Sequence, residues 1–281
     1  MKNRIHCKGG LPVIQAGVLA VVTLIAAGCE TVQTTQPGVV GVQRQQYVSP
    51  LVDRAALNKQ AGLLYKQTLG DAEKTQALNR SPEAVGRVRA IAHRIIPQVG
   101  AFRPDARNWQ WEINVINSKE LNAWCMPGGK IAVYTGLIEQ MKATDDELAQ
   151  VMGHEIAHAL REHAWERASR QATAGLGLSI VGIVLGVGQD GVDLASTVYN
   201  VTFQLPNSRE HETEADRIGI ELAARAGYDP RAAVTLWQKM ARANEGAPPK
   251  WLSTHPAAVD REQDLRIYGE KVMPLYVQAR R

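Results

Sequence analysis

The stretch TDDELAQVMGHEIAHAL, residues 144–160, combines a helix start with a metal-binding pattern. Thr144, with Glu147 three residues later, forms a capping box that opens a helix. His154 and His158 are spaced i, i+4, so both imidazoles lie on one helix face and can share one ion. Glu155 lies beside that ion, where its carboxylate can take a proton from an attacking water. A chance pentapeptide is the alternative; the capping box, the amphipathic flanks and the signs of export favour a zinc site.

A third protein ligand is expected from a separate helix, because hydrolytic zinc sites use three protein ligands and leave one position open. The segment SREHETEAD, residues 208–216, opens a predicted helix that ends at Ala226-Gly227 with glycine after the last turn. This segment offers four acids and His211 as candidate ligands. Glu212 and Asp216 are one helical turn apart and share a face.

Two further segments complete a recognisable set. They are NAWCMPGGKIAVYTGL, residues 122–137, and HPAAVDR, residues 255–261. Together with HExxH and the ExExD-type segment, they resemble the HtpX and CAAX-prenyl endopeptidase family of zinc peptidases, nearest to its periplasmic lipoprotein branch. The resemblance covers roughly residues 80–270. It implies an α+β, mostly α-helical zincin-type metallopeptidase domain, with a small β-sheet beside the HExxH helix and one Zn²⁺ per chain.

The resemblance also implies roles for the acids of the second helix. It places the third zinc ligand on Glu212. It places on Asp216 an acid that orients a ligating histidine or assists proton transfer. Glu210 and Glu214 fall off that face and are expected to be solvated or paired. His211 is the competing ligand.

The segment before HExxH is expected to bind substrate. In zincins an edge strand beside the metal pairs with the extended substrate backbone. The resemblance implies this role for residues 130–135, including Ile131, Ala132 and Val133, with Asn122 and Ala123 near the scissile bond. Cys125 is either a small core residue or a thiol near the zinc.

The HPAAVDR segment supplies a loop histidine. We expect His255 to reach the site, where it either donates to the developing oxyanion or occupies the open zinc position and keeps the enzyme latent. Arg261 would anchor this loop to a carboxylate such as Asp216; the alternative is a surface arginine.

The N-terminus is typical of a processing signal. Lys2, Arg4 and Lys8 precede an apolar run from Leu11 to Ala27, followed by Gly28-Cys29. This resembles a bacterial lipobox with Cys29 as the lipidated residue, although Ala26 stands where leucine is usual. Plain secretion or an uncleaved anchor are the alternatives. Glu30 after the cysteine favours the outer membrane. The chain is therefore expected on the periplasmic face of a bacterial envelope.

Composition then divides the rest of the chain. Residues 29–50, rich in Thr, Gln, Gly and Val, suggest a flexible tether, and residues 51–281 a single peptidase domain. Beyond residue 28 the chain has 29 basic and 28 acidic residues, which argues against nucleic-acid binding. The apolar segment 172–188 is shorter than a usual transmembrane helix. It is read as a buried or hairpin-forming helix, or as a membrane-facing or oligomer-forming patch.

Coarse elements follow from periodicity. Helices are expected from Ser81-Pro82 to about Pro97, from Thr144 to about Arg170, from Ser208, from Asp229-Pro230 to about Ala243, and after Pro256. Strands are expected over 109–117 and 130–135.

The expected function is zinc-dependent cleavage of envelope proteins, with misfolded or stalled ones as the expected substrates. Two rivals are a zinc-stabilised periplasmic chaperone or assembly factor with little proteolysis, and an intramembrane protease. The second needs several long apolar spans, and the sequence offers at most the signal and 172–188.

Overall fold

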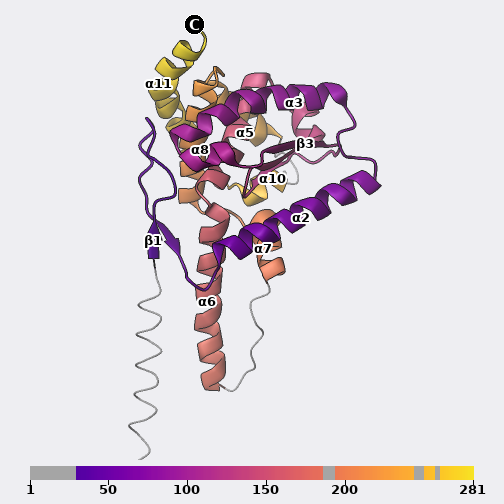
Figure 1. Cartoon of the computed structure of the whole chain (residues 1–281). Coiled ribbons are helices and arrows are strands. Elements are labelled where there is room, and N and C mark those ends of the chain that lie inside the picture. The colour runs from indigo at the N-terminus through magenta and orange to yellow at the C-terminus, as the bar shows by residue number, and fades with distance from the viewer. Residues whose placement is uncertain (1–29, 186–193, 244–249, 257–259) are drawn as a thin grey trace, which may run out of the picture.

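A computed structural model describes residues 30–185, 194–243, 250–256 and 260–281. Helices dominate these residues and two small sheets accompany them, which confirms the expected α+β class (Figure 1). The elements in chain order are β1 (Glu30–Val32), β2 (Gln46–Val48), α2 (Arg54–Lys74), α3 (Pro82–Ile95), the 3₁₀ turns Ile96–Ala101 and Pro104–Asn108, β3 (Glu112–Ile116), β4 (Ala123–Met126), β5 (Lys130–Tyr134), α4 (Thr135–Glu139), α5 (Asp145–Leu160), α6 (His163–Leu185), α7 (Leu194–Phe203), α8 (Arg209–Arg225), α9 (Ala232–Arg242), α10 (Lys250–Thr254) and α11 (Arg261–Ala279).

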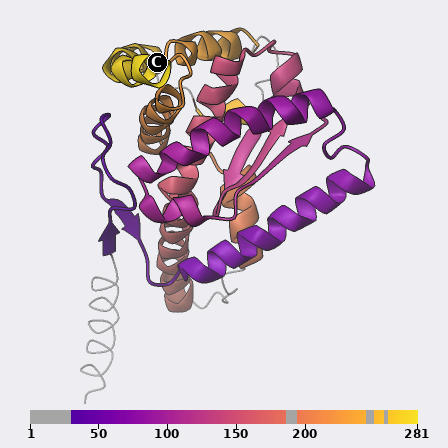
Figure 2. The same cartoon turned by 45° about the horizontal axis from the view of Figure 1, so that its top comes forward.

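The larger sheet has the strand order β3-β5-β4, with β3 parallel and β4 antiparallel to β5. One face packs on α3 and α5 through residues such as Ile131 and Val133, and the other on α2 through Ala132 and Trp124. Figure 2 shows the sheet between α3 and α2. The expectation that residues 130–135 form the edge strand is therefore wrong: β5 is central, and β4 is the edge nearest α5.

The helix starts follow the predicted capping chemistry. Ser81 Oγ accepts from the backbone N–H of Ala84, and the capping box of Thr144 and Glu147 is present in both directions. Ser208 caps α8, and Gly227 follows it with a positive φ of 77°. These caps satisfy backbone groups that would otherwise lack partners at the helix ends.

The HExxH helix ends earlier than expected. We predicted a helix through about Arg170, but α5 ends at Leu160, and Glu162 has a left-handed φ of 54° before α6 begins. The break lets α6 leave in a new direction, and its C-terminal part extends away from the body of the molecule (Figure 1). Of the apolar segment 172–188, residues 172–185 belong to α6 and the last three lie outside the described residues. No helix in the described part of the chain is long and apolar enough to span a membrane.

Residues 30–48 are not the expected flexible tether. β1 and β2 pair antiparallel, and Val40 and Val42 are buried in the main core. Gln46 is 1% exposed, and its side-chain amide donates to the Arg161 carbonyl. Composition suggested flexibility because these Thr and Gln residues are polar, but Thr34 and Gln46 both donate to the Arg161 carbonyl, more than a hundred positions away. Cys29 and the signal segment 1–28 lie outside the described residues.

Candidate metal centre

Four buried side chains from three parts of the chain converge beneath the cleft. The Nε2 atoms of His154 and His158, both on α5, are 3.0 Å apart. Glu212 of α8 reaches them with both carboxylate oxygens: Oε2 lies 3.4 Å from His154 Nε2, and Oε1 lies 3.4 Å from His158 Nε2. His255 Nδ1 lies 3.0 Å from Glu212 Oε1 and 3.2 Å from His154 Nε2. The donor atoms of all four residues lie within 4.8 Å of one another.

This donor set fits a zinc ion. Imidazole nitrogens and a carboxylate oxygen are the usual zinc ligands, and donors on a tetrahedral ion with bonds of about 2.0–2.1 Å are about 3.3–3.4 Å apart. Glu212 Oε2 is buried and has no hydrogen-bond partner, although Arg261 Nη1 lies 3.0 Å away in an ion pair. A buried carboxylate oxygen without a hydrogen bond is costly, and a cation would satisfy it.

The electrostatics of the cluster depend on Glu212. Burial lowers the pKa of His154, but the charges of Glu212 and Asp216 outweigh burial and raise it to about 9. Burial also holds the pKa of His158 well below its usual value. Burial raises the pKa of Glu212, yet the neighbouring His255 and His154 pull it well below its usual value. The site thus keeps an ionised carboxylate among imidazoles, which favours a bound cation.

Asp216 and Arg261 hold His154 in position on the Nδ1 side of its ring. Asp216 Oδ1 lies 2.9 Å from His154 Nδ1 and accepts a 2.7 Å hydrogen bond from Arg261 Nη2. The Arg261 guanidinium also lies over the ring of Trp237, 3.4 Å from its centroid. A carboxylate on Nδ1 fixes the imidazole so that Nε2 faces the donor cluster. The structure thus places Asp216 and Arg261 together, as the resemblance implied.

Glu155 sits beside the cluster and is held by an indole. Its Oε1 accepts a 2.9 Å hydrogen bond from Trp251 Nε1 and lies 3.6 Å from His255 Nε2. Trp251 also stacks on His255 with ring centroids 4.6 Å apart. Asn207 Nδ2 donates to the Thr254 carbonyl and so holds the turn that presents His255. His255, directly after α10, and Arg261, at the start of α11, are thus the two residues of HPAAVDR that reach the site.

The cleft in front of Glu155 is lined by β4 rather than β5. Asn122, Ala123 and Cys125 line it together with His158. Ile131, Ala132 and Val133 are buried in the sheet with at most 1% exposure. They therefore cannot pair with a substrate, and the strand available for that pairing is Ala123–Met126.

Cys125 shows features of both interpretations, a core residue and a thiol near the metal centre. It packs partly against the core and also lines the cleft, but it is not among the metal donors. Burial raises the pKa of its thiol well above the usual value.

A buried charged network behind the donor cluster escaped the sequence analysis. His158 Nδ1 lies 2.8 Å from His163 Nδ1, and His163 Nε2 lies 3.0 Å from Glu214 Oε2. Glu214 also pairs with the buried Arg161 and with Arg44 of the N-terminal segment. The nine-residue spacing from His154 to His163 is visible in the sequence, but the helix break that turns His163 back toward His158 is not.

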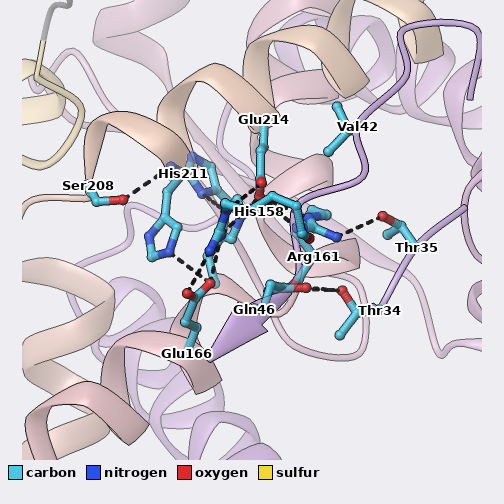
Figure 3. Close-up of polar contacts among 12 residues, drawn as sticks. Thr34, Thr35, Val42, Gln46, His158, Arg161, Glu166, Ser208, His211 and Glu214 are labelled. Atoms are coloured by element: carbon cyan, nitrogen blue, oxygen red, sulfur yellow. Dashed lines mark hydrogen bonds and ion pairs between the residues drawn. The ribbon is translucent and has the colours of Figure 1, made fainter. Parts of the chain in front are cut away.

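Figure 3 shows this network from the N-terminal segment to α8. His211 Nε2 lies 3.0 Å from Glu166, and its ring stacks on His163, so it is not among the metal donors. Arg44 also bonds to both oxygens of Glu166 at 2.8 Å. Glu210 stays exposed, whereas Glu214 is paired and buried. The expectation of a paired charge thus holds for Glu214.

Comparison with known proteins gives one family. Residues 82–268 match the family described as Peptidase family M48. The chain is 41% identical over 172 residues to the mitochondrial metalloendopeptidase OMA1 of Arabidopsis thaliana, covering 57% of this chain and 34% of that protein. It is 38% identical over 190 residues to OMA1 of Bos taurus, covering 63% and 36%. It is 30% identical over 175 residues to the beta-barrel assembly-enhancing protease of Escherichia coli, covering 59% and 36%. The match thus spans about a third of the length of these relatives.

Proposed function

The chain belongs to peptidase family M48, a family of zinc metallopeptidases, and on this premise we propose that it is an endopeptidase acting on proteins. One observation carries the proposal. The carboxylate of Glu155 is held beside a buried donor set of His154, His158 and Glu212, facing a cleft with an edge strand along it. A purely structural zinc site has no need of a positioned base facing a cleft.

The chain's own residues define the chemistry. His154, His158 and Glu212 would hold the zinc, which polarises the peptide carbonyl and makes a water acidic near neutral pH. Glu155 accepts the proton from the attacking water and returns it to the leaving amine. The Ala123–Met126 strand aligns the substrate backbone. Asp216, itself held by Arg261, keeps His154 in its binding orientation.

His255 is assigned a blocking role in this state. Its Nδ1 lies among the donor atoms, so it would take the fourth ligand position that water needs. Cleavage would then require the turn carrying His255 to move. The other role for His255, donation to the oxyanion, would use the same residue after that movement.

For the location, we propose a lipoprotein anchored through Cys29 at the periplasmic face of the outer membrane. The support is the basic, apolar N-terminus ending in Gly28-Cys29, followed by Glu30. A protease named for β-barrel assembly in Escherichia coli is a relative, which supports envelope proteins, misfolded or stalled, as substrates. On the same grounds we propose that the chain belongs nearest the periplasmic lipoprotein branch of the family.

The test uses the full chain with casein as an unfolded substrate. Cleavage is recorded with zinc, with a chelator, and for Glu155→Gln, whose zinc content is measured in parallel. We expect cleavage with zinc only, and a zinc-loaded but inactive Glu155→Gln variant. Cleavage that persists in that variant contradicts the role of Glu155. Bound zinc without cleavage, in wild type and in His255→Ala alike, would favour a zinc-stabilised chaperone.

A further inference from the structure

Arg167 is a cation in the catalytic cleft that the proposed mechanism does not use. It lies on α6, one helix turn beyond His163, and lines the same cleft as Glu155 and His158. Val201 and Phe203 of α7 line this cleft too, as do the polar side chains of His163 and Asn207. The guanidinium therefore lies in a cleft of mixed apolar and polar side chains.

Backbone carbonyls hold Arg167 in place. Nη1 donates to the Leu205 carbonyl at 2.9 Å, and Nη2 donates to the Val201 carbonyl near the end of α7. Nε is buried and has no hydrogen-bond partner. A guanidinium carries five N–H donors in a planar fork, so these two contacts leave most of its donors unused.

The lack of an ion pair separates the half-buried Arg167 from the buried arginines of the protein. Arg103, Arg161 and Arg261 each form an ion pair with a carboxylate at 3.0 Å or less. No such pair joins Arg167 to a carboxylate among the described residues. Burial lowers the pKa of Arg167 to about 10, and the charges of Glu212 and Glu155 offset only part of this effect.

Capping of α7 accounts for only part of this arrangement. A cation at a helix C-terminus satisfies carbonyl groups that lack partners. That role needs two donors and no particular exposure to the cleft. Capping alone leaves the charge of Arg167 desolvated beside the reacting groups. A desolvated charge without a partner is unfavourable. A carboxylate entering the cleft would supply the missing partner with the fork geometry that arginine prefers.

We propose that Arg167 determines substrate specificity by binding a carboxylate of the peptide substrate in the cleft. The carboxylate is either an aspartate or glutamate side chain at a constant distance from the scissile bond, or the C-terminal carboxylate of a short substrate. The inference rests on the proposed endopeptidase function.

The experiment compares the full chain carrying Arg167→Gln or Arg167→Lys with wild type. The cleavage profile is measured on a peptide library in which each position is varied through all residues. A parallel library with amidated C-termini distinguishes an acidic side chain from the C-terminal carboxylate. Arg94→Gln is the matched control, because Arg94 also donates to a carbonyl at a helix end, that of Gly227, but does not line the cleft.

We expect wild type and Arg94→Gln to prefer an acidic residue at one position over its amide by roughly tenfold to a hundredfold, the range of a charged hydrogen bond. Arg167→Gln should lose this preference through KM, and Arg167→Lys should keep part of it. A preference that vanishes on amidation assigns the C-terminal carboxylate. A wild-type profile without acidic preference, or one unchanged in Arg167→Gln, overturns the inference.

A binding measurement separates this inference from the proposed function. Anisotropy with labelled acidic and amide peptides is recorded for Glu155→Gln, with and without Arg167→Gln. Binding that requires both the acid and Arg167 supports the inference even if wild type cleaves nothing, in which case only the endopeptidase proposal fails. Equal binding of the two peptides contradicts the inference.

Discussion

Gly153 of α5 and Gly219 of α8 face each other where the two helices cross. A Cβ atom on Gly153 would lie 2.6 Å from the Gly219 carbonyl oxygen, and one on Gly219 would lie 2.6 Å from the His154 backbone nitrogen. The backbones thus approach more closely than side chains allow. Since His154 follows Gly153 and Asp216 precedes Gly219 by one turn, this contact sets the separation of the two helices that build the metal centre.

Gly219→Ala should therefore destabilise the protein and weaken zinc binding, because the methyl group can be placed only by separating α5 from α8. Overpacking of this kind costs about 1–3 kcal/mol. Gly62→Ala in α2 is the matched control, with no atom within 4 Å of the new Cβ. It should be neutral or stabilise by up to about 1 kcal/mol through helix propensity. Denaturant unfolding measures the stability of both variants. Equal changes in Gly219→Ala and Gly62→Ala would show that the close contact of α5 with α8 does not limit stability.

His163→Ala should lower zinc affinity without removing a ligand. His163 Nδ1 contacts His158 Nδ1, and loss of a group that orients a ligating histidine typically costs 10–100-fold in metal affinity. Competition with a chromophoric chelator measures the change. His93→Ala, at an exposed histidine of α3, is the control and should bind zinc normally. Wild-type affinity in His163→Ala would show that the contact does not orient His158.

His255→Ala tests the blocking role. We expect zinc binding to weaken by roughly tenfold, since three ligands remain, and cleavage of casein to increase because the fourth position opens to water. Metal content and initial rates are measured on the same preparation. Slower cleavage would instead assign His255 to the oxyanion. If zinc affinity and rate both stay unchanged, His255 has neither role.

Glu166 should make stability depend on pH. Burial raises its pKa, but hydrogen bonds from Arg44, His211 and Arg170 outweigh burial and hold the pKa far below the usual value of a glutamate. A carboxyl with a depressed folded-state pKa stabilises the fold above its unfolded pKa and loses that contribution as pH falls below it. The stability gap between wild type and Glu166→Gln should thus be largest near pH 7 and shrink below about pH 5.

Urea unfolding across this pH range measures that gap. The control is Glu262→Gln, at an exposed ion pair with Arg266 that should contribute little at any pH. A gap that stays constant from pH 7 to pH 4 would show that the ionised form of Glu166 does not stabilise the fold.

The N-terminal segment offers two adjacent valines that test whether it is docked. Val40 is 1% exposed and Val39 is 41% exposed. Val40→Asp should destabilise by about 3 kcal/mol or more, because it places an unpaired charge in the core near Glu221. Val39→Asp should change stability by less than about 0.5 kcal/mol. A flexible segment would tolerate both changes equally in a thermal melt.

Local patterns were enough to predict the helices that carry the chemistry. The capping box of Thr144, the i, i+4 histidines and the cap of Ser208 depend on residues within one or two turns, so the sequence shows them directly. The resemblance to a family added Glu212, Asp216 and His255, and the structure brings all three to His154. The helix starts and the histidine spacing involve no choice between distant partners, whereas the three added residues were known only from the resemblance.

Contacts between distant segments decided the rest. Periodicity identifies a strand but not its neighbours, so β5 was mistaken for the edge that β4 forms. Composition cannot show that the polar residues of 30–48 have buried partners just after α5, in α6 and in α8. The break at Glu162 changes the direction of one helix and brings both His163 and Arg167 to the cleft. Such placements arise from packing over long sequence separations, which no local pattern records.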